Sequence, residues 1–323
     1  MKTDEKLYIK SDDVEKVVAD YFDSNAIKVE QQQIRRVNIK GNRIYAQVDG
    51  DGNIKYAPSH TTVIHTQSKM PQGILIWYAN NGAEYCRWFL DRSADYGKYL
   101  HAVYARLFKG EKYPFDINLI EEDLKEFCWK NDMDYNDVAR WYKKENRDIR
   151  KDVYGFLHWV KEKEVKPLAI EVPLFTSEYA GVIDLVCELT WRKKRIKAIV
   201  DFKSTLKVID NYDDYAVQLY SQKKLVEQIL QIPIDMLFNF APRNFRLPVG
   251  ESVKPYEFKN QTENPVAFKW DHYLAMYQAD MPEIELQKTN FTSIDVSLET
   301  SLDEVTEDEN LEDFILDGTK GEF

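Results

Sequence analysis

The chain contains 323 residues, of which 44% are hydrophobic and 13% aromatic, so it can bury the core of one large domain or two modest ones. Its net charge of −11 is unfavourable for binding nucleic acid, unless the acidic residues are gathered away from the binding surface. No run approaches the roughly 18–20 apolar residues of a membrane-spanning helix, and the charged N-terminus carries no secretory signal, so we expect a cytoplasmic protein with no membrane partner.

The acidic residues are concentrated at the C-terminal end of the chain. Residues 294–323 contain eleven acidic residues and one lysine, a net charge of −10, and few aromatic residues. The first 293 residues hold the other 44 acidic and 43 basic residues, so their net charge is only −1. Dense like charge of this kind is typical of disorder. We therefore expect residues 291–323 to be an acidic tail on a body that can carry basic patches.

The three cysteines, Cys86, Cys128 and Cys187, stand singly in apolar or aromatic surroundings. An odd number without CxxC pairs argues against a disulfide framework or a zinc finger, and a four-cysteine iron–sulfur cluster is excluded. The phosphate-binding pattern GxxxxGK[ST] is also missing from the sequence. We expect buried free thiols in a reducing cytosol, no iron–sulfur cluster and no nucleotide cofactor.

The first elements expected along the chain are a short helix, over residues 14–21, and a group of strands. Alternating apolar and polar residues predict three strands, over residues 35–39, 43–48 and 54–56. Turns are expected at Gly41-Asn42 and over 49–53, where glycine, asparagine and aspartate gather. Residues 1–57 are thus a strand-rich accessory segment that includes a β-hairpin.

Helical periodicity dominates the following hundred residues. It predicts helices over residues 74–91, 93–108 and 120–130, and one long amphipathic helix over 136–162. Apolar residues such as Val138, Trp141, Ile149 and Val153 form a stripe on the long helix at mostly helical spacing. We assign residues 58–165 to a helical region.

The pattern changes to strands after Pro167. Short runs rich in valine, isoleucine and leucine predict strands over residues 169–175, 181–190, 196–203 and 234–240. A basic turn, residues 191–195, separates the second and third strands, and a helix over 213–230 precedes the fourth. Weaker patterns beyond Pro242 predict a strand over 266–270 and a helix over 272–279. This order predicts an α/β core over residues 166–290, with a central mixed sheet flanked by helices.

Three carboxylates interrupt these apolar strands: Glu171, Asp184 and Asp201. A carboxylate buried alone costs several kcal/mol, so such positions indicate charges that are paired or bound to a cation. Residues two apart in a strand share a face, so Asp201 and Lys203 should project together while Phe202 packs on the other side. The alternative is that each acid points out of a half-solvated sheet.

Oxygen ligands without clusters of histidine and cysteine suit Mg²⁺ or Mn²⁺ better than zinc. Such a cation neutralises a phosphodiester, activates water and stabilises the leaving oxygen. A nearby lysine can position or deprotonate the water and stabilise developing charge. The pattern therefore favours hydrolytic phosphate chemistry with Mg²⁺ or Mn²⁺ as cofactor.

The order of these motifs resembles that of RecB-like nucleases of the PD-(D/E)XK superfamily. Glu171 stands on the first strand, residues 181–186 (GVIDLV) fit G-x-[IL]-D, and residues 201–204 (DFKS) fit D-[YFW]-K-[ST]. Residues 56–64 (YAPSHTTVI) are similar to a YPSVTT[IV] element of phage, bacterial and mitochondrial exonucleases in this clan. The resemblance covers residues 44–240 and implies a restriction-endonuclease-like core.

The resemblance also implies further site residues. Residues 97–101 (GKYLH) fit the family's G-x-x-x-H pattern, which makes His101 a metal ligand beside Glu171, Asp184 and Asp201. Residues 215–219 (YAVQL) fit a Y-x-x-Q-[LV] pattern, which adds Gln218 to the catalytic set of Asp184, Asp201, Lys203 and Glu171. The further tyrosine of the family, one turn on, is replaced by Gln222, and Tyr220 is a weaker substitute.

A stripe of basic residues on the long helix is a candidate for binding a phosphate backbone. It consists of Arg140, Lys143, Lys144, Arg147, Arg150 and Lys151. Acidic neighbours such as Glu145 and Asp148 make a merely solvated face an equal alternative. Trp77, Tyr78, Trp88 and Tyr99 could stack on unpaired bases, although such aromatics are more often part of a core.

The function implied is that of a metal-dependent deoxyribonuclease, which hydrolyses phosphodiester bonds in the cytosol of a bacterium or phage-infected host. We expect an exonuclease on single-stranded or end-containing DNA, in repair or recombination, because the helical region could arch over a strand. The alternatives are a structure-specific or duplex endonuclease, or a non-catalytic nucleic-acid-binding or virion protein that keeps the fold. The acidic tail could be a solubilising segment, a competitor of DNA, or a docking segment for a replication, recombination or virion partner.

Overall fold

The computed structural model of the chain describes residues 34–39, 42–48, 54–114, 116–204, 213–243 and 254–280. The predicted helix over 14–21, the turn over 49–53 and the acidic tail lie outside these residues.

A five-stranded mixed sheet forms the centre of the fold. Its strands are β4 (Lys166–Phe175), β5 (Ala180–Trp191), β6 (Lys194–Phe202), β7 (Met236–Pro242) and β8 (Tyr256–Asn260), in that spatial order. All neighbours are antiparallel except β6 and β7, which run parallel because the helix α8 (Asp214–Leu225) crosses over between them. The predicted α/β class is confirmed.

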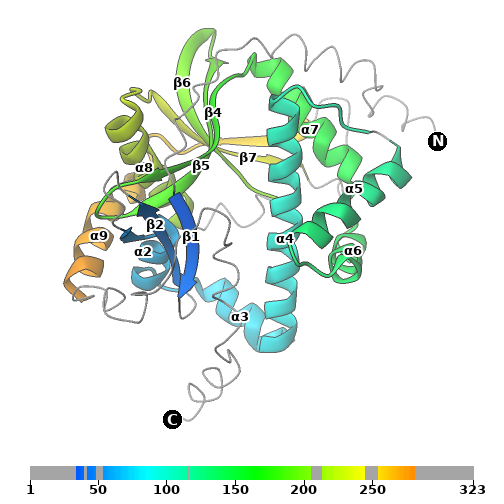
Figure 1. The fold of residues 1–323 in the computed structure, drawn as a ribbon, viewed down its shortest axis with the longest axis horizontal. Helices are drawn as coiled ribbons and strands as arrows, with labels where there is room; N and C mark the ends of the chain where they lie inside the picture. The colour runs from blue at the N-terminus through cyan, green and yellow to red at the C-terminus, as the bar shows by residue number, and fades with distance from the viewer. Residues whose placement is uncertain are drawn as a thin grey trace.

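Helices cover both faces of this sheet (Figure 1). On one face Cys187, Val200 and Phe240 pack against α4 (Ala83–Phe108) and α7 (Ile149–Lys163). On the other face Ile183, Ile199 and Leu237 pack against α2 (His60–Gln67), α8 and α9 (Lys269–Asp280). A sheet buried on both faces requires near-continuous apolar strands, which is why the acidic positions in them are informative.

The helical region confirms the prediction of helices but not all of their boundaries. Its elements are α3 (Gln72–Asn81), α4, α5 (Ile117–Lys130), α6 (Tyr135–Lys144) and α7. The predicted helix over 74–91 is wrong, because Gly82 takes a φ of 81° and ends α3 there. Beyond Gly82 the chain continues as one 26-residue helix, α4, in place of two.

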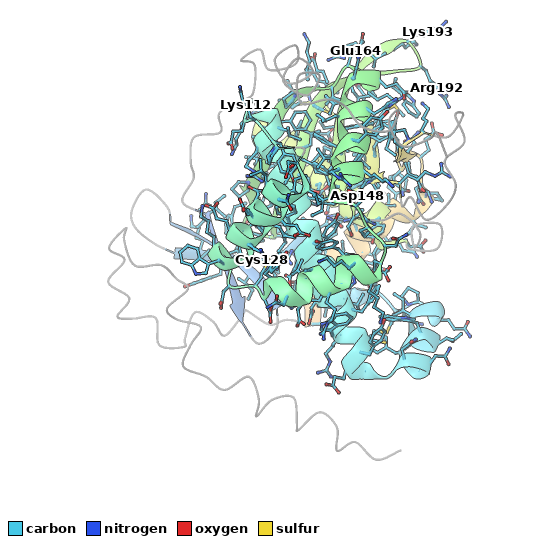
Figure 2. All side chains as sticks on the ribbon, turned by 90° about the vertical axis from the view of Figure 1, so that its right-hand side faces the viewer. Lys112, Cys128, Asp148, Glu164, Arg192 and Lys193 are labelled. Carbon is cyan, nitrogen blue, oxygen red and sulfur yellow. The ribbon has the colours of Figure 1, made fainter. Side chains whose placement is uncertain are left out.

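The predicted single helix over 136–162 is also wrong. It is two helices, α6 and α7, separated by a turn in which Asn146 takes a φ of 49°. Asp148 then begins α7, since its side chain accepts a hydrogen bond from the Arg150 backbone N–H. Figure 2 shows Asp148 at the start of that helix. The basic stripe expected along one helix is therefore divided between two.

A smaller antiparallel sheet stands beside β4 and β5. It consists of β1 (Ile34–Ile39), β2 (Asn42–Val48) and β3 (Ile54–Pro58), which confirms the three strands predicted there. Tyr45 and Ala57 of this sheet pack against Phe175 and Ala180 of the large one. Ser59 continues the contact through a parallel bridge to Ala180.

The glycine of the G-x-I-D motif is required by this contact. A Cβ added at Gly181 would lie 2.0 Å from the His60 Nδ1 atom at the start of α2. Burial, helped by Arg43 and Lys203, lowers the pKa of His60 to about 3, so its ring is neutral. The close approach joins the motif at residues 56–64 to the strand that carries Asp184.

The C-terminal part of the fold differs from the weak pattern beyond Pro242. The strand predicted over 266–270 is wrong, because Asn264 caps the Val266 N–H and Pro265 begins a 3₁₀ turn, Pro265–Phe268, that leads into α9. The helix predicted over 272–279 is confirmed within α9. The strand β8 was not predicted. The helix predicted over 213–230 is α8 followed by a π-helical turn, Val226–Leu230.

Within the described residues, no helix combines the length and apolar character needed to cross a membrane. The three cysteines are free thiols inside the fold. The β5–β6 hairpin turns at Arg192 and Lys193, both with positive φ, and Figure 2 shows these side chains at its outer tip.

Candidate metal site and the adjoining polar cluster

The acidic residues predicted from sequence lie on one rung of the large sheet. The pairs Ile170↔Leu185 and Val172↔Ile183 flank Glu171 and Asp184, which therefore stand opposite each other. The pairing of β5 with β6 is described up to Leu185↔Val200, and the next residues toward the same end are Asp184 and Asp201. Asp201 in turn pairs with Asn239 on β7. Four neighbouring strands thus bring polar side chains to the same level.

Strand alternation breaks at this rung. Ile183 packs in the core on the α8 side and Leu185 in the core on the α4 side, although residues two apart normally share a face. The same reversal separates Val172 from Ile170 on β4. The break turns the side chains between them, Glu171 and Asp184, out of the regular pleat.

The cause on β4 is the backbone of Glu171, which takes a φ of 47° in the middle of a strand. The other described non-glycine residues with positive φ lie in turns or at helix ends: Asp132, Asn146, Glu164, Arg192, Lys193 and Gln231. A left-handed residue inside a strand costs roughly 1–3 kcal/mol and persists only when its surroundings hold it. Such strain gathers at functional sites, which supports a role for Glu171 beyond packing.

On β5 the side chain of Asp184 replaces a main-chain acceptor. Its Oδ2 atom accepts a hydrogen bond from the Phe202 N–H at 2.7 Å, where the β5–β6 ladder ends. The residue is only 8% exposed. Burial raises the pKa of Asp184 to about 7, with His101 opposing the rise and Asp201 adding to it.

His101 approaches this rung from α4. Its Nδ1 atom lies 3.2 Å from Glu171 Oε1 and 3.8 Å from Asp184 Oδ1. Its Nε2–H donates to the Phe202 carbonyl at 3.1 Å, so Nδ1 is the nitrogen that faces the carboxylates and would bind a cation after losing its proton. Burial lowers the pKa of His101, but the carboxylates of Asp184 and Glu171 outweigh it and raise this pKa to about 9.

These three residues could hold a metal ion. His101, Glu171 and Asp184 each offer one ligand atom, and the three atoms lie within 4.8 Å of one another. Two carboxylates and one imidazole form a donor set suited to a divalent cation. The glycine of the G-x-x-x-H pattern has no steric necessity, because a Cβ at Gly97 would make ordinary contact with Ser204 Cβ at 4.0 Å.

Asp201 lies beside this triad in a separate polar cluster. Its Oδ1 accepts from Gln218 Nε2 at 2.9 Å, and its Oδ2 lies 2.8 Å from Lys203 Nζ. Asn239 Nδ2 donates to the same Oδ2 at 2.7 Å. Asp201 is 1% exposed, so these donors hold its charge inside the fold. Its predicted role as a metal ligand stays a prediction.

Lys203 projects with Asp201, as strand alternation predicts. Its Nζ atom also lies 3.3 Å from Gln218 Oε1 and 4.5 Å from the centre of the Tyr215 ring. Burial lowers the pKa of Lys203, but Asp201, Tyr215 and Asp184 outweigh it and raise this pKa. Lys203 is therefore protonated at neutral pH.

Two members of this cluster were not predicted as site residues, Asn239 and Tyr215. Asn239 interrupts an apolar strand in the same way as the three carboxylates, and that signal was present in the sequence. Tyr215 carries the first position of the Y-x-x-Q-[LV] pattern. Tyr220 instead packs against Phe268 and lies under Lys224, and no described contact joins it to Lys203.

The candidate DNA-binding residues divide into exposed and buried ones. Arg140 and Lys144 on α6 are exposed and lie over the ring of Trp88, with Lys143 exposed beside them. Arg147 is different: its side chain is 3% exposed and forms an ion pair with Asp152. Arg150 binds Asp148, which caps the same helix. Arg147 is therefore a structural residue rather than part of a solvent-facing stripe.

The aromatic residues considered for base stacking also divide. Trp77, Tyr78 and Trp88 are half-buried near the exposed end of α4. Tyr99 is fully buried, and its hydroxyl group bonds Tyr113 and Asp123. Tyr99 therefore belongs to the core and cannot stack on a base.

The protonation of the triad predicts how its affinity for cations depends on pH. A cation must displace the proton on His101 (pKa about 9) and, below pH 7, the one on Asp184 (pKa about 7). Affinity for Mn²⁺ should therefore rise with pH between 6 and 8.5, by up to about tenfold per unit for each proton released. Calorimetric titration in two buffers of different ionisation enthalpy would count the protons. A pH-independent affinity would contradict this ligand set.

Comparison of the sequence with known proteins finds no family model that matches it and no matching curated protein. The assignment of the site therefore depends on its own geometry and chemistry.

Proposed function

We propose that the chain is a metal-dependent nuclease of the RecB-like branch of the PD-(D/E)XK superfamily. The observation that carries this proposal is the single rung that joins the two clusters. The His101, Glu171 and Asp184 triad lies directly beside the cluster of Asp201, Lys203 and Gln218. The residues of both groups are the ones that the motifs single out in the sequence.

The triad would hold Mg²⁺ or Mn²⁺, with Asp201 as the further acidic ligand that the resemblance implies. When bound, such a cation neutralises the phosphodiester and lowers the pKa of a coordinated water. The imidazole of His101 is oriented for this role. Its Nε2–H donates a hydrogen bond to the Phe202 carbonyl, and its Nδ1 faces the carboxylates.

Lys203 supplies a second positive charge to the same site. Because its pKa is raised rather than lowered, the ammonium group is suited to orient water and stabilise charge on the phosphate, and not to act as a general base. Gln218 holds both partners of the Lys203–Asp201 pair through its two amide atoms. Its position on α8 fixes the pair against the sheet.

DNA is the substrate that we propose for this site. Arg140, Lys143 and Lys144 form an exposed cationic surface beside the half-buried ring of Trp88. Cations and an aromatic ring are the two elements of surfaces that bind single strands. Exonuclease action on single-stranded or end-containing DNA is the form of the activity that we propose.

A nuclease assay with Mn²⁺ or Mg²⁺ tests this proposal on linear and circular DNA, single- and double-stranded. The expected result is degradation of linear substrates, with circular ones left intact because they offer no end. Cleavage of circular DNA would establish the endonuclease instead. Binding without cleavage of any substrate, with either cation, would refute the nuclease and favour the non-catalytic nucleic-acid-binding protein.

A further inference from the structure

A chain of side-chain amides runs from the C-terminal part of the fold to Asp201. Asn264 Nδ2 donates to Gln261 Oε1 at 2.9 Å, and Gln261 Nε2 donates to Asn239 Oδ1 at 3.0 Å. Asn239 Nδ2 then donates to Asp201 Oδ2 at 2.7 Å. The chain begins where Asn264 Oδ1 accepts the Val266 N–H at the start of the 3₁₀ turn.

The direction of every bond in this chain is fixed by its two ends. An ionised carboxylate only accepts hydrogen bonds, so Asn239 must present its NH₂ group to Asp201 and its carbonyl oxygen to Gln261. A backbone N–H only donates, so Asn264 must present its oxygen to Val266 and its NH₂ group to Gln261. Both requirements give Gln261 the same orientation, with its NH₂ group toward Asn239 and its oxygen toward Asn264. Every hydrogen bond in the chain therefore joins one donor to one acceptor.

The central members of the chain are inaccessible to water. Asn239 is 0% exposed and Gln261 is 3% exposed. Burying an amide is costly unless its atoms are paired, and water cannot replace a lost partner here. Packing alone would be served better by apolar residues, like those that surround Asn239 on β7.

The carboxylate of Asp201 needs such a constraint. The torsion that rotates an aspartate carboxylate is broad and has no sharp minimum, so its oxygens stay in place only when partners hold them. Lys203 and Gln218 contact it through flexible side chains of their own. Asn239 contacts Oδ2 from a buried strand and is itself held by Gln261.

We propose that Asn239 and Gln261 are positioning residues that fix the Asp201 carboxylate for the reaction at the metal site. This inference rests on the proposed nuclease function. It gives β8 and the segment after it, which sequence patterns missed, a role in the site. Partners of this kind cost about 10–100-fold in metal affinity or activity when they are removed.

We call the hydrogen-bonded amides of Asn264, Gln261 and Asn239 the relay. The test compares three variants of the relay with a matched control. Asn239→Leu and Asn239→Val remove the donor to Asp201 and place an apolar side chain of similar size in the strand. Gln261→Met keeps the length of the side chain but cannot donate to Asn239, so the Asn239 amide is no longer held with its NH₂ group toward Asp201. The control is Thr262→Val, which loses the hydrogen bond from the Leu237 N–H beside the relay without touching it.

In steady-state cleavage of linear DNA, measured where all variants are folded, kcat should fall at least about tenfold in the three relay variants and less than twofold in Thr262→Val. KM for DNA should change by less than about twofold, because the relay does not touch the substrate. Relay variants that lose no more kcat than Thr262→Val would overturn the proposal.

The affinity for Mn²⁺, measured by calorimetry, separates this inference from the proposed function. If the wild-type protein binds Mn²⁺ but cleaves no DNA, the proposed nuclease activity is refuted. The relay is then tested by the affinity for Mn²⁺, which should fall about tenfold in the three variants. Unchanged affinity in that case would overturn the relay as well. A wild-type protein that neither binds Mn²⁺ nor cleaves DNA would overturn both.

Discussion

Asp184→Asn should reduce DNA cleavage by about a thousandfold or more, and should at the same time stabilise the folded protein above pH 7. The loss follows from the triad, because an amide is a poor ligand for Mg²⁺ or Mn²⁺ and cannot replace the charge of Asp184 beside His101. The asparagine can keep the hydrogen bond from the Phe202 N–H through its carbonyl oxygen.

The stabilisation follows from the raised pKa of Asp184. Burial raises this pKa from 3.8 to about 7, so the folded state takes up a proton more readily than the unfolded state. The resulting stability is present below pH 4 and is lost as pH rises through 7. Asparagine carries no such dependence, so the difference in Tm between variant and wild type should grow from pH 5 to pH 8.

Two comparison variants make this result specific. Glu188→Gln changes an acid further along β5, outside the triad, whose Oε2 lies 3.8 Å from Arg195 Nε, and should leave cleavage unchanged. Lys203→Met should lose cleavage like Asp184→Asn but lower Tm, since Asp201 would stay buried without its ammonium partner. Wild-type activity in Asp184→Asn, or a lower Tm for it at pH 8, would contradict the assignment of Asp184.

Strand periodicity accounts for much of what the sequence predicted correctly about the site. The Asp201, Phe202 and Lys203 triplet lies as alternation requires, with Phe202 in the core against Tyr104 and Phe156 and the two charged residues on the opposite face. Period-two patterns depend only on backbone geometry, so they can be read without tertiary information.

Glu171 shows where such reasoning fails. Its left-handed backbone inside β4 reverses the alternation, and sequence patterns for a regular strand cannot anticipate that break. The packing of the neighbouring strands and the contact with His101 explain why the Glu171 side chain turns toward the other two residues of the triad. Contacts between residues 70 apart in sequence are set by the tertiary fold.

The two wrong helix boundaries have local causes that are visible in the sequence. Trp141 and Ile149 are eight residues apart, which shifts the apolar stripe by most of a quarter turn. Between them, Asn146 takes a left-handed backbone conformation and Asp148 is the N-cap of α7. Gly82 gives a similar signal between α3 and α4. Strand β8, by contrast, is short and only partly buried, and its pairing with β7 is what defines it.

Asp152→Ala should destabilise the protein by about 3–5 kcal/mol, which is a large share of the stability of an ordinary domain. The Arg147–Asp152 pair links the turn before α7 to the first turn of that helix, with side chains only 3% and 2% exposed. Tyr96 donates a further hydrogen bond to Asp152 Oδ2 at 2.6 Å. Removing the carboxylate would leave the guanidinium of Arg147 buried without a counter-charge.

The effect should reach the proposed nuclease site through Arg147. Its Nη2 donates to the Ser204 carbonyl at 2.6 Å, directly after Lys203 in the chain. Without its counter-charge the buried guanidinium would hold Ser204 less firmly, so Asp152→Ala should also lower kcat in the fraction that stays folded. Urea unfolding measures the stability, and cleavage below the unfolding transition measures the second effect.

The same measurements decide between the structural and the DNA-binding reading of Arg147. The triple variant Arg147→Met, Asp152→Leu and Tyr96→Phe should recover most of the lost stability, because apolar side chains of similar volume replace the buried ion pair and the hydroxyl that donates to Asp152. Arg140→Met, at an exposed position on α6, should change the free energy of unfolding by less than about 0.5 kcal/mol. It should instead weaken DNA binding and reduce the salt dependence of affinity. If Arg147→Met behaved like Arg140→Met in both assays, the buried ion pair would not be important for stability. Arg147 would then be a DNA-binding residue.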